Sequence, residues 1–234
     1  MDWNFTAEEI YGSFTREPWQ HQTRSVRDVC AIFSTGCKSL VLCAPTGAGK
    51  SLVTTALVNL VRLRGGRVII YNSRRLLTQQ SFDNLNFDNI VLGTRAASMK
   101  DYRDDGAPVQ VAQLQTDIRR VIKQESWSLF PADLVIIDEA HMSLSEQPVE
   151  LMQRYLARGA CVLGLTGTPI GMSGVYRDIA VAATNSELRE CGAHVPAKCF
   201  GVHEMDVSQI KKEKNGEYKE VDITKEIWSL AFVG

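Results

Sequence analysis

The stretch APTGAGKS occupies residues 44–51, between an apolar run and a segment with helical periodicity. It follows the apolar run Ser39 to Ala44 and precedes Ser51 to Leu63, in which apolar residues recur on one helical face. A glycine-rich turn between a strand and a helix lets successive backbone N–H groups point inward, and the positive end of the helix dipole adds to them. The sequence therefore predicts an anion-binding loop at this junction.

The side chains of this loop suit a nucleoside triphosphate. Lys50 can reach the β and γ phosphates as a point charge, and the Ser51 hydroxyl can ligate Mg²⁺. Ala44 departs from the general Walker A pattern, which has glycine there, and an ordinary glycine-rich turn is the alternative interpretation. ATP and Mg²⁺ are the expected cofactors, and the candidate nucleotide-binding residues of the loop are Thr46, Gly47, Ala48, Gly49, Lys50 and Ser51.

A second stretch, ADLVIIDEAH at residues 132–141, places two carboxylates at the end of an apolar run. Open α/β sheets bind ligands at the carboxyl ends of their strands. Asp138 is suited to hold Mg²⁺, and Glu139 to accept a proton from the water that attacks the γ phosphate. A solvated strand end is the alternative, and a lone histidine such as His141 is more often a packed or capping residue.

Apolar runs alternate with helix-period segments along the chain, which is typical of βαβ units. We therefore predict an α/β fold with a mostly parallel sheet covered by helices on both faces. The predicted strands are Ser39 to Ala44, Arg67 to Tyr71, Asn89 to Leu92, Val109 to Ala112, Asp133 to Ile137 and Ala160 to Leu165.

The remaining segments are less regular. A second helix is predicted from about Glu146 to Arg158, and the polar stretch Gly93 to Pro108 is predicted to be a loop. After Pro169 the periodicity weakens, until Asn215-Gly216 suggests a turn and Thr224 to Phe232 a short helix.

Composition restricts the class of protein. Lys and Arg number 26 against 27 Asp and Glu, so any nucleic-acid contact must be local. No apolar run approaches the ~20 residues of a membrane span, and the N-terminus lacks the features of a signal peptide, which predicts a cytoplasmic protein without membrane association. None of the six cysteines forms a Cys-x-x-Cys pair, so reduced thiols rather than structural zinc are expected.

Residues 138–141 resemble the Asp-Glu-Ala-His box of superfamily 2 DEAD/DEAH-box helicases and translocases, and this setting makes His141 a candidate catalytic residue beside Glu139, Asp138 and Lys50. Motifs in the family's order span roughly residues 14 to 170. The resemblance implies a RecA-like P-loop NTPase domain over residues 1–196, with 197–234 starting the connection to a second RecA-like domain that is absent. The tail also resembles, weakly, that of RadD-like bacterial repair helicases.

Other stretches resemble further motifs of this family. Pro18-Trp19-Gln20 is similar to the Q motif, which makes Gln20 the candidate for reading adenine, with a neutral turn as the alternative. Residues 72–80 and 113–116 resemble motifs whose side chains contact nucleic-acid phosphates, here Arg74, Arg75, Gln115 and Thr116, although the arginines can also be ordinary surface charges. Residues 164–169 resemble motif III, which implies a coupling role for Thr166 and Thr168.

The resemblance implies the first motor domain of an ATP-dependent helicase or translocase acting on DNA or RNA, with DNA favoured. A second RecA-like domain would complete the ATP site in cis or in trans, and the isolated chain is expected to be a monomer. A duplex translocase of a restriction or remodelling type, a non-hydrolysing ATP-binding module and an unrelated P-loop ATPase remain the alternatives.

Overall fold

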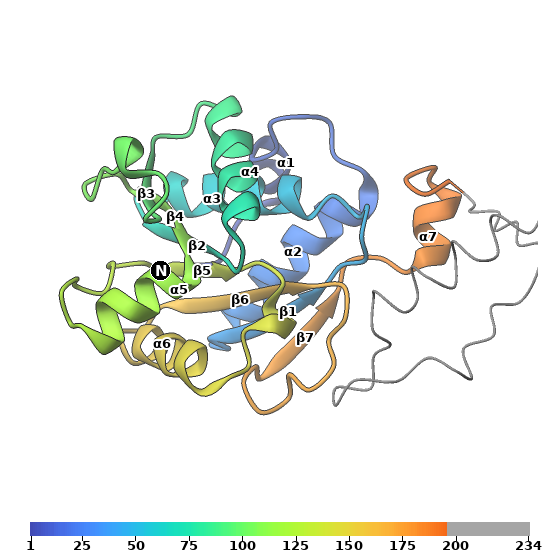
Figure 1. Cartoon of the computed structure of the whole chain (residues 1–234). Coiled ribbons are helices and arrows are strands. Elements are labelled where there is room, and N and C mark those ends of the chain that lie inside the picture. The colour runs from blue at the N-terminus through green and yellow to red at the C-terminus, as the bar shows by residue number, and fades with distance from the viewer. Residues whose placement is uncertain (196–234) are drawn as a thin grey trace, which may run out of the picture. The chain divides into compact units, whose positions relative to one another are not determined.

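The computed structural model describes residues 1–195, which form a seven-stranded sheet. The strand order is β3-β4-β2-β5-β6-β1-β7, and every pairing is parallel (Figure 1). The predicted α/β class with a parallel sheet is therefore confirmed. The strands are β1 Ser39–Cys43, β2 Val68–Asn72, β3 Leu92–Arg95, β4 Val109–Gln113, β5 Leu134–Ile137, β6 Cys161–Thr166 and β7 Asp178–Val181.

Helices cover both faces of the sheet. Ile70 of β2 belongs to the apolar cluster under α2 and α3, whereas its neighbours Ile69 and Tyr71 belong to the cluster under α6. Figure 1 shows α3 and α4 on one side of the sheet and α6 on the other. The α-helices are α1 Ala7–Gly12, α2 Gln20–Ser34, α3 Lys50–Leu63, α4 Arg75–Phe87, α5 Leu114–Asp117, α6 Glu146–Ala157 and α7 Asn185–Glu190; 3₁₀ helices span Lys100–Tyr102 and Ala140–Met142, and a π-helix spans Ile118–Lys123.

The third predicted strand was misplaced. It starts at Leu92 rather than Asn89, because Asn89 adopts a φ of 58° in the turn that ends α4. The segment Gly93 to Pro108 is therefore not simply a loop, since it holds the rest of β3 and a 3₁₀ helix. Leu92 pairs with Val109 of β4.

Two elements after Pro169 were not predicted from the sequence. β7 is an edge strand beside β1 in which only Ala180 is buried, so it lacks the continuous apolar run of an inner strand. The short helix α7 starts with a capping box at Thr184 and Glu187. The predicted turn at Asn215-Gly216, the helix from Thr224 to Phe232 and the connection at 197–234 lie outside the described residues.

The sheet register aligns the segments that carry the motifs. Asn72 is paired with Gln113, Tyr71 with Ile137, and Cys43 with Thr166, and each of these strands ends at the same edge of the sheet. Parallel strands place their ligand-binding loops at this carboxyl edge. Within residues 1–195 there is no helix with the length and apolarity needed to cross a membrane.

Candidate nucleotide-binding site

The loop between β1 and α3 has the backbone form of an anion-binding turn. Gly47 and Gly49 adopt φ values of 83° and 76°, a left-handed region that glycine enters without a steric penalty. A Cβ atom at Gly47 would collide with the ring of His194, and one at Gly49 with the amide of Gln22. Gly49 is the N-cap of α3, so the positive end of that helix opens onto the loop.

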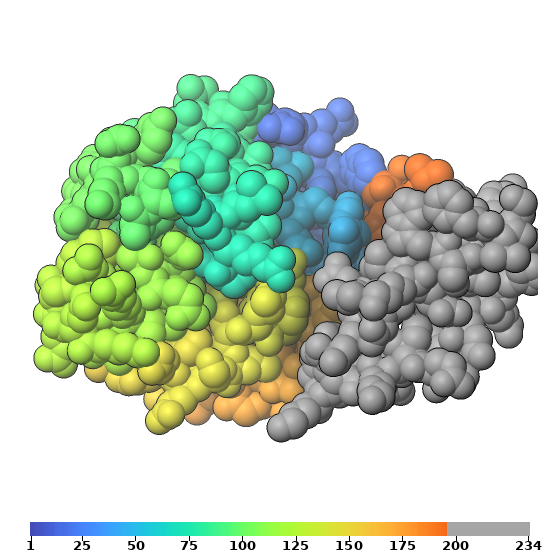
Figure 2. All heavy atoms as spheres, in the orientation of Figure 1, coloured from blue at the N-terminus to red at the C-terminus, as the bar shows by residue number. Residues whose placement is uncertain are grey.

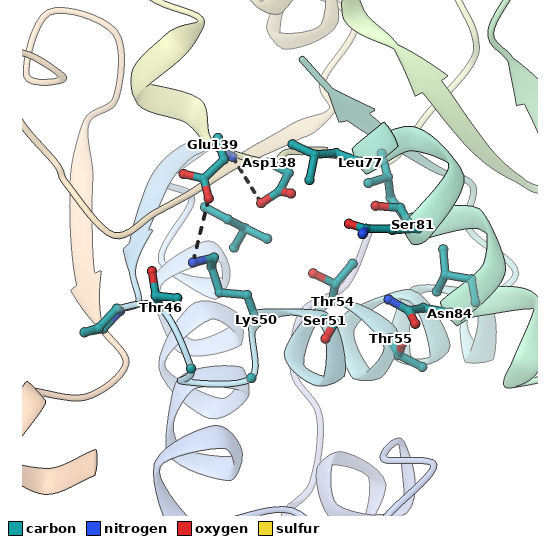
Figure 3. A pocket seen from close by; sticks show the side chains of 17 residues that line it. Thr46, Lys50, Ser51, Thr54, Thr55, Leu77, Ser81, Asn84, Asp138 and Glu139 are labelled. Atoms are coloured by element: carbon teal, nitrogen blue, oxygen red, sulfur yellow. Dashed lines mark hydrogen bonds and ion pairs between the residues drawn. The ribbon is translucent and has the colours of Figure 1, made fainter. Parts of the chain in front are cut away.

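A cavity of about 430 Å³ joins this loop to the acidic end of β5. Thr46, Lys50 and Ser51 line it from the loop, and Asp138 and Glu139 line it from the opposite wall (Figure 3). Two stretches far apart in the sequence therefore meet in one cavity, as the sequence analysis expected of a nucleotide site.

Lys50 and Glu139 point toward one another across this cavity (Figure 3). Lys50 Nζ lies 4.0 Å from Glu139 Oε1 and donates a hydrogen bond of 3.2 Å to the carbonyl oxygen of Ala44. Glu139 adopts a φ of 49°, which is uncommon outside glycine and costs roughly 1–3 kcal/mol. This backbone turn directs the carboxylate toward the lysine.

Asp138 is partly buried in the same wall of the cavity. Burial and the neighbouring Glu139 charge raise its pKa, whereas the N–H of Glu139, which donates to Oδ1 at 3.1 Å, and Lys50 lower it. A cation next to Asp138 would relieve this cost. The described residues contain no cluster of three His, Cys, Asp or Glu side chains able to hold a metal, but Mg²⁺ commonly uses one or two protein ligands together with substrate phosphates. Ser51 and Asp138, which line the same cavity, fit that ligand set.

A chain of polar contacts joins the acidic box to the end of β6. His141 Nδ1 lies 3.4 Å from Glu139 Oε2 and 2.9 Å from the Thr166 hydroxyl. The Thr166 hydroxyl also accepts a bond from the backbone N–H of Thr168 at 3.0 Å. The structure therefore places Glu139, His141, Thr166 and Thr168 in one continuous arrangement.

Among the residues that the structure describes, no hydrogen bond joins Gln20, the predicted adenine-reading residue, to the loop. Gln20 is exposed at the start of α2, whereas Gln22 is buried and donates to the carbonyl oxygen of Ala48 at 3.3 Å. Gln22 also accepts from the N–H of Trp19 at 2.9 Å, which makes it a capping residue of α2. The signal that could have found Gln22 is its place at the third position of that helix.

Two histidines also reach the loop and were not predicted. His21 Nε2 donates to the carbonyl oxygen of Ala48 at 3.0 Å, and His194 Nε2 makes a short hydrogen bond with the carbonyl oxygen of Thr46. His194 is 148 positions from Thr46, so no local pattern indicates their contact.

The proposed nucleic-acid residues lie at the ends of two adjacent strands. Arg74 and Arg75 follow β2 and are exposed, and Gln115 and Thr116 follow β4, where Gln115 is exposed and Thr116 partly buried. The pairing of β2 with β4 makes these two segments neighbours.

Residues 15–171 match the family described as "Type III restriction enzyme, res subunit". The chain belongs to this family. The match covers the phosphate loop, the acidic box and most of the described sheet, so the site lies within the region that matches the family.

Solved structures share the fold of this res-family chain. It is similar to the UvsW helicase from bacteriophage T4 at 22% identity and a TM-score of 0.56, over 71% of this chain and 60% of that one. A second structure of T4 UvsW gives 21% identity and a TM-score of 0.56, over 74% and 36%. The Hef helicase domain from Pyrococcus furiosus gives 18% identity and a TM-score of 0.52, over 68% and 38%.

The fold and the family together identify an N-terminal RecA-like domain of the superfamily 2 helicase type. The chain spans 60% or less of each of these solved chains. No curated protein sequence matches it.

Proposed function

We propose that this chain is the first motor domain of an ATP-dependent superfamily 2 nucleic-acid translocase or helicase. The observation that carries the proposal is the cavity in which Lys50 faces Glu139, with Ser51 and Asp138 on its walls. Phosphoryl transfer needs a cation for the transferred group, ligands for a metal and a base for water, and this cavity gathers all three.

Each residue has a separate task in the proposed hydrolysis. Backbone N–H groups of the loop and Lys50 would bind the phosphates, and Ser51 and Asp138 would hold the metal. Bound Mg²⁺ neutralises phosphate charge and orients the phosphates for in-line attack. Glu139 accepts the proton of the attacking water, and His141 fixes the position of that carboxylate.

The Lys50–Glu139 ion pair sets the sequence of these steps, with phosphate binding by Lys50 before proton transfer to Glu139. In the structure Lys50 contacts both Glu139 and the Ala44 carbonyl. When Lys50 turns to a phosphate it leaves Glu139, whose carboxylate is then available to a water molecule. The base is therefore released by the binding of its substrate.

The proposed track is DNA. The family description names a restriction enzyme subunit, whose substrate is DNA, and the exposed Arg74 and Arg75 suit phosphate contacts that read no base. The same description favours, as a second candidate, translocation along duplex DNA without strand separation. A second RecA-like domain, in cis or in trans, would supply the opposite wall of the ATP site.

A non-hydrolysing ATP-binding module is the principal competitor. Such a module has no chemical need for Glu139, which here keeps a strained backbone and a lysine partner. ATP hydrolysis by the complete protein, measured with single-stranded DNA, duplex DNA, RNA or no nucleic acid, separates these functions. Stimulation by DNA supports the motor, stimulation by duplex alone supports the translocase, and the absence of turnover with intact ATP binding supports the module.

A further inference from the structure

We propose that the π-helix Ile118–Lys123 extends the nucleic-acid track, with Gln115, Arg119 and Lys123 contacting the sugar-phosphate backbone. This inference rests on the proposed function, because it assigns further residues to the same track. None of the motifs in the sequence includes Arg119 or Lys123.

The three side chains form one row on the surface. Consecutive members of the row are four residues apart in the sequence. All three side chains are exposed, and they line one depression together with Ile118 and Gln124. No carboxylate lines this depression. Among the described residues, no ion pair uses Arg119 or Lys123, so both charges face solvent in this part of the chain.

The π-helix separates these two cations from the arginine between them. The N–H of Gln124 donates to the carbonyl of Arg119 at 2.9 Å, the wider spacing of a π-helix, which occurs frequently at functional sites. Arg120 lies over the ring of Trp127, 5.6 Å from its centroid, and bonds to Gln124. Arg120 therefore packs against the protein while Arg119 and Lys123 stay at the surface.

The start of the row is held by a buried polar network. Asp117, at the junction of α5 and the π-helix, accepts hydrogen bonds from Arg95 at 3.0 Å and from the Tyr71 hydroxyl at 2.6 Å. Arg95 also donates to the carbonyl of Ser128 beyond the π-helix at 3.0 Å. A backbone fixed at both ends presents its cations in a set geometry, which lowers the entropic cost of binding an extended polyanion.

The row continues the track already proposed. Its first member, Gln115, follows β4, which lies beside β2 and therefore beside Arg74 and Arg75. Figure 2 shows the residues near 75, in teal, and those near 120, in lime green, on the same viewed face. An amide, a guanidinium and an ammonium group, spaced along a helix with no apolar side chain beyond Ile118, suit phosphate and sugar oxygens rather than base edges.

The test uses double variants of the 234-residue chain. Arg119→Gln with Lys123→Gln removes the two cations of the row. Arg27→Gln with Arg189→Gln is the control, because it removes the same number of charges at exposed positions of α2 and α7. Anisotropy of a labelled 30-mer, as single-stranded DNA, duplex DNA or RNA of two unrelated sequences, is followed across a salt series. For the first variant we expect roughly tenfold weaker binding at low salt and a log–log salt slope lower by about 1.4 to 1.8, on both sequences.

The remaining outcomes decide against the inference in distinguishable ways. If the Arg119/Lys123 variant has the same salt slope as the control variant, the inference is wrong, and this holds even if the row binds an acidic protein instead. A lowered slope for Arg74→Ala with Arg75→Ala would in that case still support the proposed function. If neither the Arg119/Lys123 variant nor the Arg74/Arg75 variant changes the salt slope, or if the unmodified chain binds no nucleic acid, the whole proposed nucleic-acid track is contradicted. If the first variant melts early, Arg119→Lys with Lys123→Arg must restore binding, and its failure to do so also overturns the inference.

Discussion

Glu139 lies close to both a lysine ammonium group and a histidine ring. Its carboxylate lies 4.0 Å from Lys50 and 3.4 Å from the ring of His141, and about a third of the side chain remains exposed. Solvent screening limits the stability that such contacts contribute. Their importance is positional, because they hold a carboxylate where phosphate and water meet.

Lys50→Ala removes the cation that faces the phosphates and leaves the apolar core unchanged. We expect Mg-ATP to raise the melting temperature of the unmodified chain, because ligand binding stabilises by RT ln(1 + [L]/Kd), and to have no effect on this variant. Thermal unfolding with and without Mg-ATP measures both. Lys100→Ala, at an exposed position, is the control that should keep the shift. An equal shift in the Lys50 variant would contradict the assignment.

Glu139→Gln keeps the shape of the side chain and removes its basicity. When this chain is joined to the proposed second RecA-like domain, we expect ATP binding to persist and single-turnover hydrolysis to fall about 10²- to 10⁴-fold, the usual loss for a general base. Glu190→Gln, at an exposed position on α7, should hydrolyse normally. Near-normal chemistry in the Glu139 variant would remove this residue from the mechanism.

At this scale the sequence anticipated the phosphate loop better than the residues packed behind it. The loop residues, Asp138 and Glu139 could be placed together because each follows a buried strand, and parallel strands end at one edge. The role of Gln22 could not be predicted, because it depends on the residue at which α2 begins. A shift of two residues in that start decides whether Gln20 or Gln22 reaches Ala48. The adenine contact of Gln20 stays a prediction.

At the scale of elements, the network around Asp117 ties β2, β3 and α5 together. The carboxylate is fully buried and the Arg95 side chain is only 7% exposed. Burial raises the pKa of Asp117, whereas Arg95 and the Tyr71 hydroxyl lower it. The charge is therefore tolerated only because its partners are in place.

Arg95→Met leaves that carboxylate buried without its partner, and we expect the free energy of unfolding to fall by about 3–5 kcal/mol at neutral pH. Removing the cation raises the pKa of Asp117 further, so the folded state binds a proton more readily than the unfolded state. The deficit should then shrink as the pH falls toward that raised pKa. Urea unfolding at several pH values measures both effects.

Two controls separate the buried pair from simple loss of an arginine. Arg154→Gln breaks the exposed pair with Glu150 and should cost only about 0.3–0.5 kcal/mol. Arg95→Met with Asp117→Leu should be less destabilising than Arg95→Met alone. An additive loss in the double variant would show that the network is not held by charge.

Prediction succeeded for the five inner strands and failed at the margins of the sheet. The inner strands β1, β2, β4, β5 and β6 consist mainly of buried apolar residues, because helices cover both faces of the sheet. β3 ends in the buried Thr94 and Arg95, whose burial depends on partners in other elements, and β7 is exposed on three of four residues. Neither has a periodicity that a local pattern could detect.

The cavity between the phosphate loop and the acidic box lacks one component of efficient phosphoryl transfer. None of the described residues that line it is an arginine. In related enzymes an arginine at the transferred phosphate contributes about 10³- to 10⁵-fold in rate. We infer that a second RecA-like domain supplies this group.

The 234-residue chain should accordingly bind ATP weakly, hydrolyse it very slowly and fail to unwind a duplex. Phosphate release by the purified chain, compared with that of a protein carrying a second RecA-like domain, measures the difference, which we expect to be about 10³-fold or more. Light scattering on the same sample tests the expectation that the chain is a monomer. Strong DNA-stimulated hydrolysis by that monomer would contradict the inference.

Because the strands run parallel, the edge of the sheet opposite the phosphate loop carries no proposed site residue and can be labelled. The turns at residues 34–36, 62–65 and 157–159 precede β1, β2 and β6, are exposed, and lie at the edge opposite the phosphate loop. None of the proposed site residues is found in them. A fluorophore attached there would move with the rigid sheet and touch neither nucleotide nor DNA, so its distance to a dye on a second domain would report closure without altering the chemistry that drives it.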